Sequence, residues 1–254
     1  PAGSADVAAA HLPVVTMLGL SNVPSQLDIL TDQLTGTVTL SGLQSFLDIE
    51  DLYVQVSGLA LGDAHDLSLM QDPTNGNPFD DLSQVFWTSI SVPANTERLV
   101  AEIVASEAPD VDLFVGTGAT PSDASTVCVS ASGIWDEYCN LDHPANGTYW
   151  VLVQNWQGSA AQPDAIRAIT GVVVSNALNL TVSGPSAVPA QQIYELDVSW
   201  DEASMVSGDY WYAQFSVGTD QPEAGNLGTV NVDLEFFEAF YAMDLAPATQ
   251  DSYA

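Results

Sequence analysis

The stretch Asn146-Gly-Thr-Tyr-Trp-Val-Leu-Val-Gln-Asn-Trp156 decides the fold class. Successive side chains of a β-strand point to opposite faces. The tyrosine and valines at 149, 151 and 153 therefore share one face, and Trp150, Leu152 and Trp156 share the other. Both faces are apolar, as expected of a strand that is buried on both sides. The sequence predicts a packed β structure around these residues.

Similar segments extend from this strand in both directions. Alternating runs rich in Val, Thr, Tyr, Phe and Trp recur from residue 36 to residue 236, separated by Gly, Pro, Asn and Asp. Helical periodicity is confined to Pro24–Leu34 and the last twenty residues, and it is weak in both. The chain is therefore predicted to be all-β, with tandem β-sandwich modules. The expected strands are 36–41, 51–58, 84–92, 98–105, 112–116, 125–130, 147–155, 168–174, 178–183, 193–200, 209–218 and 228–236.

Turn-forming residues divide the chain into segments. The run Gln71-Asp-Pro-Thr-Asn-Gly-Asn-Pro-Phe-Asp-Asp81 predicts a surface loop that closes an N-terminal segment, residues 1–81. Residues 82–175 are predicted to form a jelly-roll-like sandwich. Residues 176–236 are predicted to form an immunoglobulin- or fibronectin-like module, and residues 237–254 a C-terminal tail.

The last module has too few strands of its own. Residues 178–236 supply four expected strands, whereas an immunoglobulin-like sandwich has about seven. An exposed edge near Tyr210–Phe215 is an aggregation hazard that proteins normally cover. We therefore expect this module to pair with an extended segment, either the strands at 36–58 of the same chain or a terminal segment of another chain.

The charge of the chain excludes several kinds of partner. There are 33 acidic residues against Arg98 and Arg167, with no lysine, and the formal net charge is -31. Such a surface repels nucleic acid backbones and anionic lipid headgroups, so we expect neither as a partner. Repulsion within the acidic coat weakens as salt shortens the Debye length from about 10 Å at 0.1 M to about 3 Å at 1 M. This predicts a saline environment.

Several features indicate an exported protein, extracellular or at the cell surface. The sequence begins at Pro1 without a leader, so we expect that a signal or precursor was removed or that the chain is a fragment. No run of 18 or more apolar residues predicts membrane insertion. Cys128 and Cys139 lie close together between turn-like residues, without histidines at the spacing of a metal site. We predict that they form a disulfide, which suits export.

Calcium is the cofactor that the sequence suggests, because Asp and Asn oxygens on turns are its natural ligands. The alternative for such residues is that they stabilise the turns themselves. The first candidate cluster is not an EF-hand, because its twelfth position is Ser83. The two clusters are Asp72, Asn75, Asn77, Asp80 and Asp81, and separately Asp110 and Asp112.

No catalytic residue is predicted. His11, His65 and His143 are isolated in the sequence, and no Gly-x-Ser-x-Gly turn accompanies them. The six tryptophans are candidates for a binding face, with core packing as the alternative. Trp135, between the two cysteines, is the tryptophan that we expect to face solvent and to bind a ligand.

The middle of the chain resembles the bacterial pre-peptidase C-terminal domain, a small β-sandwich appended to secreted peptidases. The resemblance rests on the order of Asp110-Val-Asp-Leu-Phe-Val115, Gly116-Thr-Gly-Ala-Thr-Pro-Ser122, the two cysteines and the strand at 146–156. With Asp72-Pro-Thr-Asn-Gly76 and Asp209-Tyr-Trp-Tyr-Ala-Gln-Phe-Ser-Val-Gly-Thr219, residues from about 30 to 236 resemble the region after the catalytic domain of secreted subtilisin-like peptidases.

The resemblance implies an accessory role beside a protease. The catalytic motifs Gly-Thr-Ser-Met-Ala, His-Gly-Thr and Asp-Thr-Gly are missing, so no catalytic residue is carried over. The leading hypothesis is a non-catalytic extracellular region for substrate or surface attachment, with a protein or polymeric substrate as partner. The competing hypothesis is a structural subunit of an extracellular fibre or coat, whose partners are identical subunits joined by β-strand donation.

Overall fold

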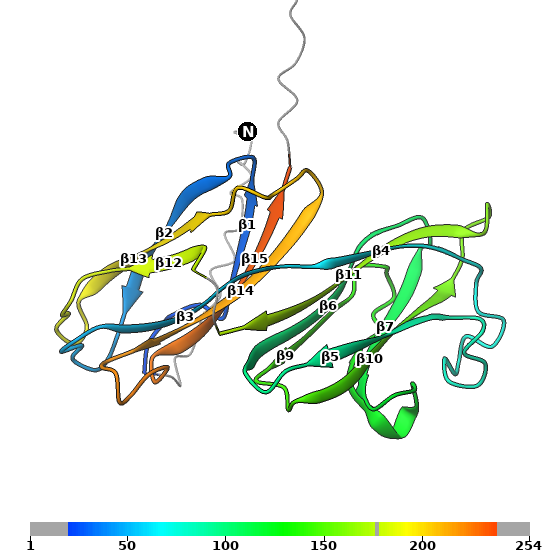
Figure 1. The fold of residues 1–254 in the computed structure, drawn as a ribbon, viewed down its shortest axis with the longest axis horizontal. Helices are drawn as coiled ribbons and strands as arrows, with labels where there is room; N and C mark the ends of the chain where they lie inside the picture. The colour runs from blue at the N-terminus through cyan, green and yellow to red at the C-terminus, as the bar shows by residue number, and fades with distance from the viewer. Residues whose placement is uncertain (1–19, 176–177, 238–254) are drawn as a thin grey trace, which may run out of the picture.

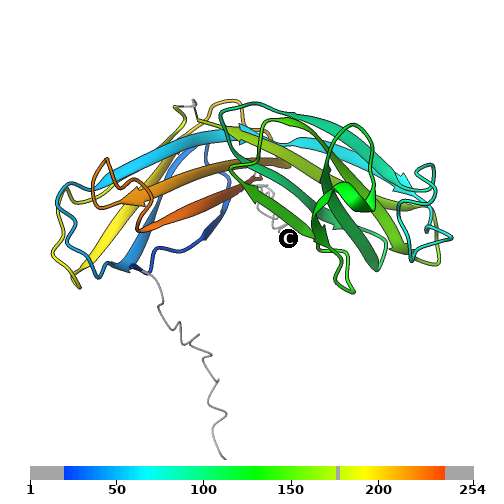
Figure 2. The ribbon, with the colours of Figure 1, turned by 90° about the horizontal axis from the view of Figure 1, so that it is seen from below.

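The computed structural model describes residues 20–175 and 178–237, which form two β-sandwiches side by side (Figure 1). One is assembled from residues 20–61 and 178–237, and we call it the split sandwich. The other comprises residues 63–174, and we call it the inserted sandwich. Together they form a shallow arch (Figure 2). The all-β, tandem-sandwich prediction is confirmed. Within the described residues, no helix has the length and apolarity needed to cross a membrane.

The split sandwich has the strand order of an immunoglobulin-like fold. One sheet has the order β1-β15-β14-β3, and the other β12-β13-β2. Apart from β1, which pairs in parallel with β15, these orders correspond to the GFC and BED sheets of that fold. The strands are β1 (Gln26–Thr31), β2 (Thr35–Gln44), β3 (Tyr53–Leu61), β12 (Leu180–Ser183), β13 (Ile193–Asp201), β14 (Asp209–Gly218) and β15 (Gly228–Phe236).

Strands from the two ends of the described chain complete this sandwich. β2 pairs with β13, and β3 pairs with β14, both antiparallel. β14 contains Tyr210–Phe215 and lies between β15 and β3, so the edge that the strand count predicts to be open is covered by the same chain. Helical periodicity at Pro24–Leu34 is misleading, because Gln26–Thr31 forms β1 along the edge of β15. The expected tail at 237–254 and the weak helical periodicity of the last twenty residues lie almost entirely outside the described residues.

The inserted sandwich is an eight-stranded jelly roll. Its two sheets have the orders β5-β10-β7-β8 and β4-β11-β6-β9, so consecutive strands lie in opposite sheets except for β7 and β8, which pair with each other, as in a fold of two Greek keys. It begins at Asp63, because β4 pairs with β11, whereas the turn-former pattern places these residues in the N-terminal segment. Its elements are β4 (Asp63–Leu69), β5 (Phe86–Val92), β6 (Thr96–Ser106), β7 (Asp110–Thr117), a 3-10 turn η1 (Asp123–Ser125), β8 (Thr126–Ser130), β9 (Tyr138–Asp142), β10 (Gly147–Gln157) and β11 (Asp164–Val174).

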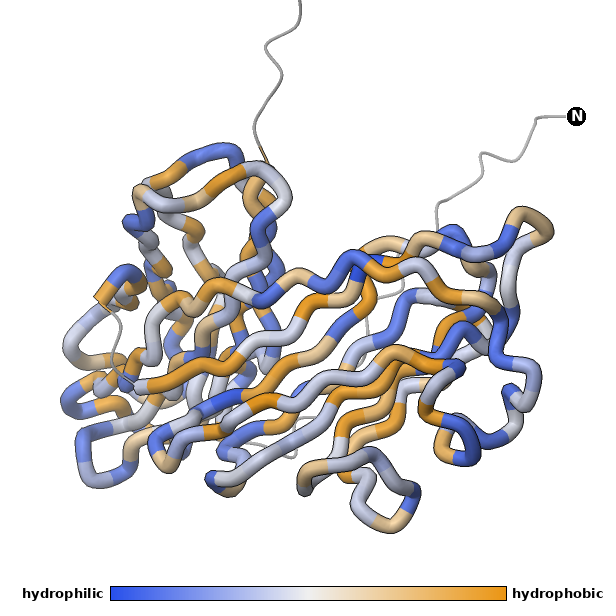
Figure 3. Tube along the Cα trace, turned by 45° about the vertical axis from the view of Figure 1, so that its right-hand side comes forward, coloured by the Kyte–Doolittle hydropathy of each residue, from blue (hydrophilic) through white to orange (hydrophobic). Residues whose placement is uncertain are grey.

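Alternating burial builds a separate core in each sandwich, and hydrophobic and hydrophilic stretches alternate along the strands (Figure 3). On β10, Val151 and Val153 face the interior of the inserted sandwich. Trp150 and Leu152 face outward, where Phe79 of the 71–84 loop covers them. The predicted burial of this strand on both faces is therefore correct, with a loop and not a third sheet as the outer layer.

The first connection between the two sandwiches is very short. Gly62 alone separates β3 from β4. A Cβ atom at Gly62 would lie 2.8 Å from Cε2 of Tyr212, and one at Gly171 would lie 2.4 Å from Cδ2 of the same ring. Tyr212 is fully buried in a small apolar cluster that includes Val100 and Ile169 of the inserted sandwich. The two sandwiches therefore share packed side chains where they meet.

Candidate functional site at the junction of the sandwiches

The structure places the first predicted calcium cluster in the loop between β4 and β5. Asp72 is buried and its Oδ1 accepts a hydrogen bond of 2.9 Å from the backbone N of Thr74. Asp80 accepts from the hydroxyl of Thr74, and Asp81 accepts from the backbone and hydroxyl of Ser83. Hydrogen bonds within turns therefore occupy oxygens of all three carboxylates.

The second cluster lies on the outward face of β7, close to part of the first. Asn75 and Asn77 line the same surface cleft as Asp112, whereas Asp80 and Asp81 do not line it. Burial raises the pKa of Asp112 to about 6, and the charges of Asp110 and Glu137 raise it further. No group of three or more His, Cys, Asp and Glu side chains in the described part of the chain is arranged to hold a metal ion. Calcium at either cluster stays a prediction.

The predicted disulfide is confirmed. Cys128 of β8 and Cys139 of β9 are bonded, and β8 and β9 are edge strands of opposite sheets of the inserted sandwich. Trp135, in the loop between them, is half-buried and packs against the core. Among the tryptophans, Trp156 is more open, with 37% of its surface exposed.

The histidines are dispersed. Nε2 of His65 lies 3.1 Å from the hydroxyl of Thr170, and Nδ1 of His143 lies 2.9 Å from Glu97. His11 lies outside the described residues. The polar partner of His65 is a hydroxyl alone and that of His143 is a carboxylate alone, so neither contact pattern resembles a nucleophile triad.

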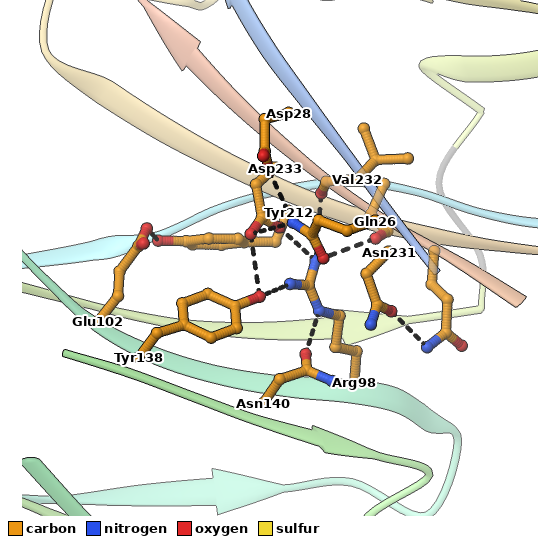
Figure 4. Close-up of polar contacts among 12 residues, drawn as sticks. Gln26, Asp28, Arg98, Glu102, Tyr138, Asn140, Tyr212, Asn231, Val232 and Asp233 are labelled. Carbon is orange, nitrogen blue, oxygen red and sulfur yellow. Dashed lines mark hydrogen bonds and ion pairs between the residues drawn. The ribbon is translucent and has the colours of Figure 1, made fainter. Parts of the chain in front are cut away.

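Arg98 is the centre of the contact between the sandwiches. It extends from β6 with no solvent exposure, and its Nη1 lies 2.5 Å from Oδ1 of Asp233 on β15 (Figure 4). Nη1 also donates to the backbone oxygens of Ala213 and Val232, at 3.2 and 3.1 Å. Burial alone would lower the pKa of Arg98, but the hydrogen bond and charge of Asp233 raise it, so the guanidinium stays charged.

Side chains of the inserted sandwich accept the remaining hydrogen bonds of Arg98. Its Nε donates to Asn140 and its Nη2 to the hydroxyl of Tyr138, both on β9. The Tyr138 hydroxyl donates in turn to Oδ2 of Asp233, at 2.9 Å. The guanidinium also lies 5.6 Å from the centroid of the Tyr212 ring. One buried cation therefore connects both sheets that face the junction.

Glu102 is a second ionisable group of the junction, and it is half-buried. Its Oε1 accepts a 2.5 Å hydrogen bond from the hydroxyl of Tyr212. Burial raises the pKa of Glu102 to about 7, against the lowering effect of that hydrogen bond, and the charge of Asp233 adds to the increase. Near neutral pH this carboxyl group is therefore divided between its protonated and ionised forms.

A cleft of about 510 Å³ opens beside this network. Its surface combines carboxylates and tyrosines with exposed apolar residues such as Leu30, which is 67% exposed. Carboxylate and phenol oxygens accept hydrogen bonds, so the cleft suits a ligand that presents N–H or O–H donors. It is lined by Gln26, Asp28, Ile29, Leu30, Glu102, Tyr138, Tyr210, Asp233, Leu234 and Glu235.

The titration of Glu102 gives a testable pH dependence. A carboxyl group with a raised pKa in the folded state stabilises the fold fully below its unfolded pKa of 4.5, and this contribution is lost as pH rises toward 7. Relative to a Glu102→Gln variant, which keeps an acceptor for Tyr212, the wild type should lose about 3 kcal/mol of unfolding free energy between pH 4.5 and 7. Urea unfolding at several pH values measures the difference.

The matched control for this prediction is Glu195→Gln, which removes an equal charge from an exposed position on β13. The wild type and this control should show nearly parallel pH profiles. If the profiles of wild type and Glu102→Gln were parallel instead, Glu102 would titrate normally in the folded protein.

Comparison with known proteins locates the family resemblance within the inserted sandwich. Residues 84–155 match the family model of the bacterial pre-peptidase C-terminal domain. The match spans β5 to β9 and most of β10, and it confirms the resemblance for that part of the chain. No curated protein matches the chain. The pre-peptidase C-terminal-like segment supplies Arg98, Glu102 and Tyr138 to the junction, and the split sandwich supplies Tyr212 and Asp233.

None of these junction residues is among the site residues that the sequence predicts. One signal was present: Arg98, one of two cations in the chain, directly precedes the apolar run Leu99-Val-Ala. A cation in such a strand has to find a buried partner. Its partner Asp233 is one of 33 acidic residues, and nothing in the sequence distinguishes it from the others.

Proposed function

We infer that this chain is a non-catalytic extracellular accessory region of a secreted subtilisin-like peptidase, and that it attaches the enzyme to a protein substrate or surface. The observation that carries the proposal is the match of residues 84–155 to a domain of bacterial peptidases. The disulfide supports an oxidising, extracellular compartment. The junction supports an attachment role, because it fixes the surfaces of the two sandwiches relative to one another.

The way in which one sandwich is inserted into the other favours a rigid arrangement of the two. The inserted sandwich enters through Gly62 and is held to β15 through Arg98. Buried hydrogen-bonded charge pairs in packed interfaces restrict relative motion, unlike the flexible linkers that usually separate domains. A rigid pair of modules presents its surfaces in a fixed geometry, which increases avidity when both contact one substrate particle.

Co-sedimentation tests this proposal. The whole chain should sediment with an insoluble protein such as gelatin-coated particles, should remain in solution with cellulose particles, and should release no peptides from casein in the same buffer. Binding only to cellulose would contradict the protein attachment role, and peptide release would contradict the non-catalytic role. Serum albumin at the same concentration controls for nonspecific sedimentation.

The competing fibre hypothesis is no longer supported by an open sheet edge. It depended on an open edge along β14, and that edge is paired on both sides within one chain. Donation by residues 1–20 falls almost wholly outside the described residues. We therefore do not put fibre assembly forward as the function.

A further inference from the structure

A second cleft, of about 610 Å³, lies on the outer face of the inserted sandwich, away from the junction. The loop residues Asn75 to Phe79 border it on one side. The outward-facing side chains of β7 and β10 contribute Asp112, Phe114 and Gln154, and Asp123 and the exposed ring of Trp156 also line it. Aromatic and acceptor groups therefore meet in one concave surface.

The acceptor groups at this cleft lack donors. Gln154 is fully buried, and its Nε2 donates to Oδ2 of Asp72 at 2.5 Å and to the backbone O of Asn75 at 3.2 Å. Its Oε1 is buried without any hydrogen-bond partner in the described structure. A buried acceptor without a donor is unfavourable in free energy, so a ligand that supplies a donor would stabilise it.

The positions of these acceptors suit a single planar group. Asp112 lies directly opposite Gln154 in the register of β7 and β10, which places their Cβ atoms about 4.5–5.5 Å apart on the same face. The carboxylate of Asp112 has no hydrogen bond to any other described residue. A guanidinium group presents five N–H donors in a rigid plane and also stacks on aromatic rings. Trp156 offers such a ring at the same cleft.

The chain cannot supply this cation from its own side chains. The sequence has no lysine and only two arginines. Arg98 is held by Asp233 at the junction, and Arg167 lies 3.4 Å from Asp66 on β4. A donor cation therefore has to come from another molecule, and the net charge of -31 would attract it.

We propose that the cleft between the 75–79 loop and β7–β10 binds an arginine side chain of a protein ligand. The guanidinium donates to Asp112 and stacks on Trp156, and Gln154 turns its Oε1, which is buried in the free protein, toward the same group. This inference rests on the proposed attachment function, for which it names the ligand class. Sugars and calcium ions are the other ligands that such a set of oxygens can hold, and the test distinguishes them.

The test is calorimetric titration of the whole chain with the peptide acetyl-Gly-Arg-Gly-amide in 0.15 M sodium chloride. The expected result is measurable binding of this peptide and at least tenfold weaker binding of the same peptide with citrulline, the neutral isostere of arginine. Asp112→Asn and Trp156→Ala should each weaken binding at least tenfold. Glu195→Gln is the matched control, because it removes one exposed charge from the split sandwich.

Four results would overturn the assignment. The first two are equal binding of the arginine and citrulline peptides and no binding of either peptide. The third is equal weakening of peptide binding by Asp112→Asn and by Glu195→Gln. The fourth is that calcium chloride or a soluble sugar competes with the peptide, and that Asp112→Asn abolishes this competition. Because the peptide pair is compared on the wild-type chain, the outcome does not depend on the folding of a variant. If Asp112→Asn still sediments normally with insoluble protein, attachment stands and the ligand assignment fails. Peptide binding without sedimentation would support the arginine site and contradict the attachment function.

Discussion

Replacement of Arg98 by methionine is expected to reduce the free energy of unfolding by about 3–5 kcal/mol, the largest effect of any single substitution that we predict. The variant keeps an unbranched apolar side chain in the site but removes every donor. Asp233 would then be left near the junction without its cation, and the backbone oxygens of Ala213 and Val232 would lose their shared donor. Unfolding in urea at pH 7, followed by tryptophan fluorescence, measures the loss.

Arg167→Met is the matched control, because Arg167 is the other cation of the chain. Its side chain is 38% exposed, and its partner Asp66 is 75% exposed at a distance of 3.4 Å. Exposed ion pairs contribute about 0–1 kcal/mol. If both variants lost the same small amount of stability, the buried charge network would not be what holds the sandwiches together.

Removal of the disulfide is expected to produce the second-largest effect. Cys128 and Cys139 are 11 residues apart, and closing a loop of that length restricts the unfolded chain by about 3 kcal/mol in the entropic model. A Cys128→Ala, Cys139→Ala double variant should therefore unfold at lower urea concentration than the oxidised wild type. Alanine is the appropriate substitution because Cys139 is buried and a serine hydroxyl would need a partner.

A reducing agent provides the control within the same experiment. Reductant should move the urea midpoint of the wild type close to that of the double variant, and it should leave the double variant unchanged. A wild-type midpoint that does not respond to reductant would contradict both the contribution of the bond and the argument for an oxidising compartment.

The central strands of both sandwiches were predictable from the sequence, and three edge strands were not. β10 is buried on both faces, so its apolar pattern is continuous. The three strands that were missed, β1, β4 and β9, all lie at the edge of a sheet. Edge strands bury fewer side chains and carry polar residues that discourage aggregation, as in Asp63-Ala-His-Asp66 of β4. Their sequences therefore resemble those of loops.

The insertion of one sandwich into another was only partly predictable. A count of four strands in residues 178–236 required strands from elsewhere, and 36–41 and 51–58 were correctly identified as one source. The boundary at 82 was too late because the Gln71–Asp81 loop is so dense in turn formers. That loop lies within the jelly roll, between β4 and β5, and covers Trp150 of its outer face.

The candidate sites depended on pairings that single residues do not reveal. The disulfide could be predicted because two cysteines allow only one pairing. The junction could not, since it joins Arg98 to a residue 135 positions away. Three residues of the outer cleft, Asn75, Asn77 and Asp112, were predicted as calcium ligands, but the sequence assigns them to two separate clusters. Gln154 was missed because it occupies a position in an otherwise apolar strand, with no sign that its oxygen lacks a donor.

The attachment role is tested most directly by joining this chain to the C-terminus of a subtilisin-like catalytic domain and measuring peptide release. We predict that the fusion hydrolyses an insoluble protein several-fold faster than the catalytic domain alone, while the two hydrolyse a short soluble chromogenic peptide at equal rates. Equal rates on the insoluble protein would contradict the proposed function, and so would an equal increase on both substrates, because the chain would then affect catalysis and not attachment.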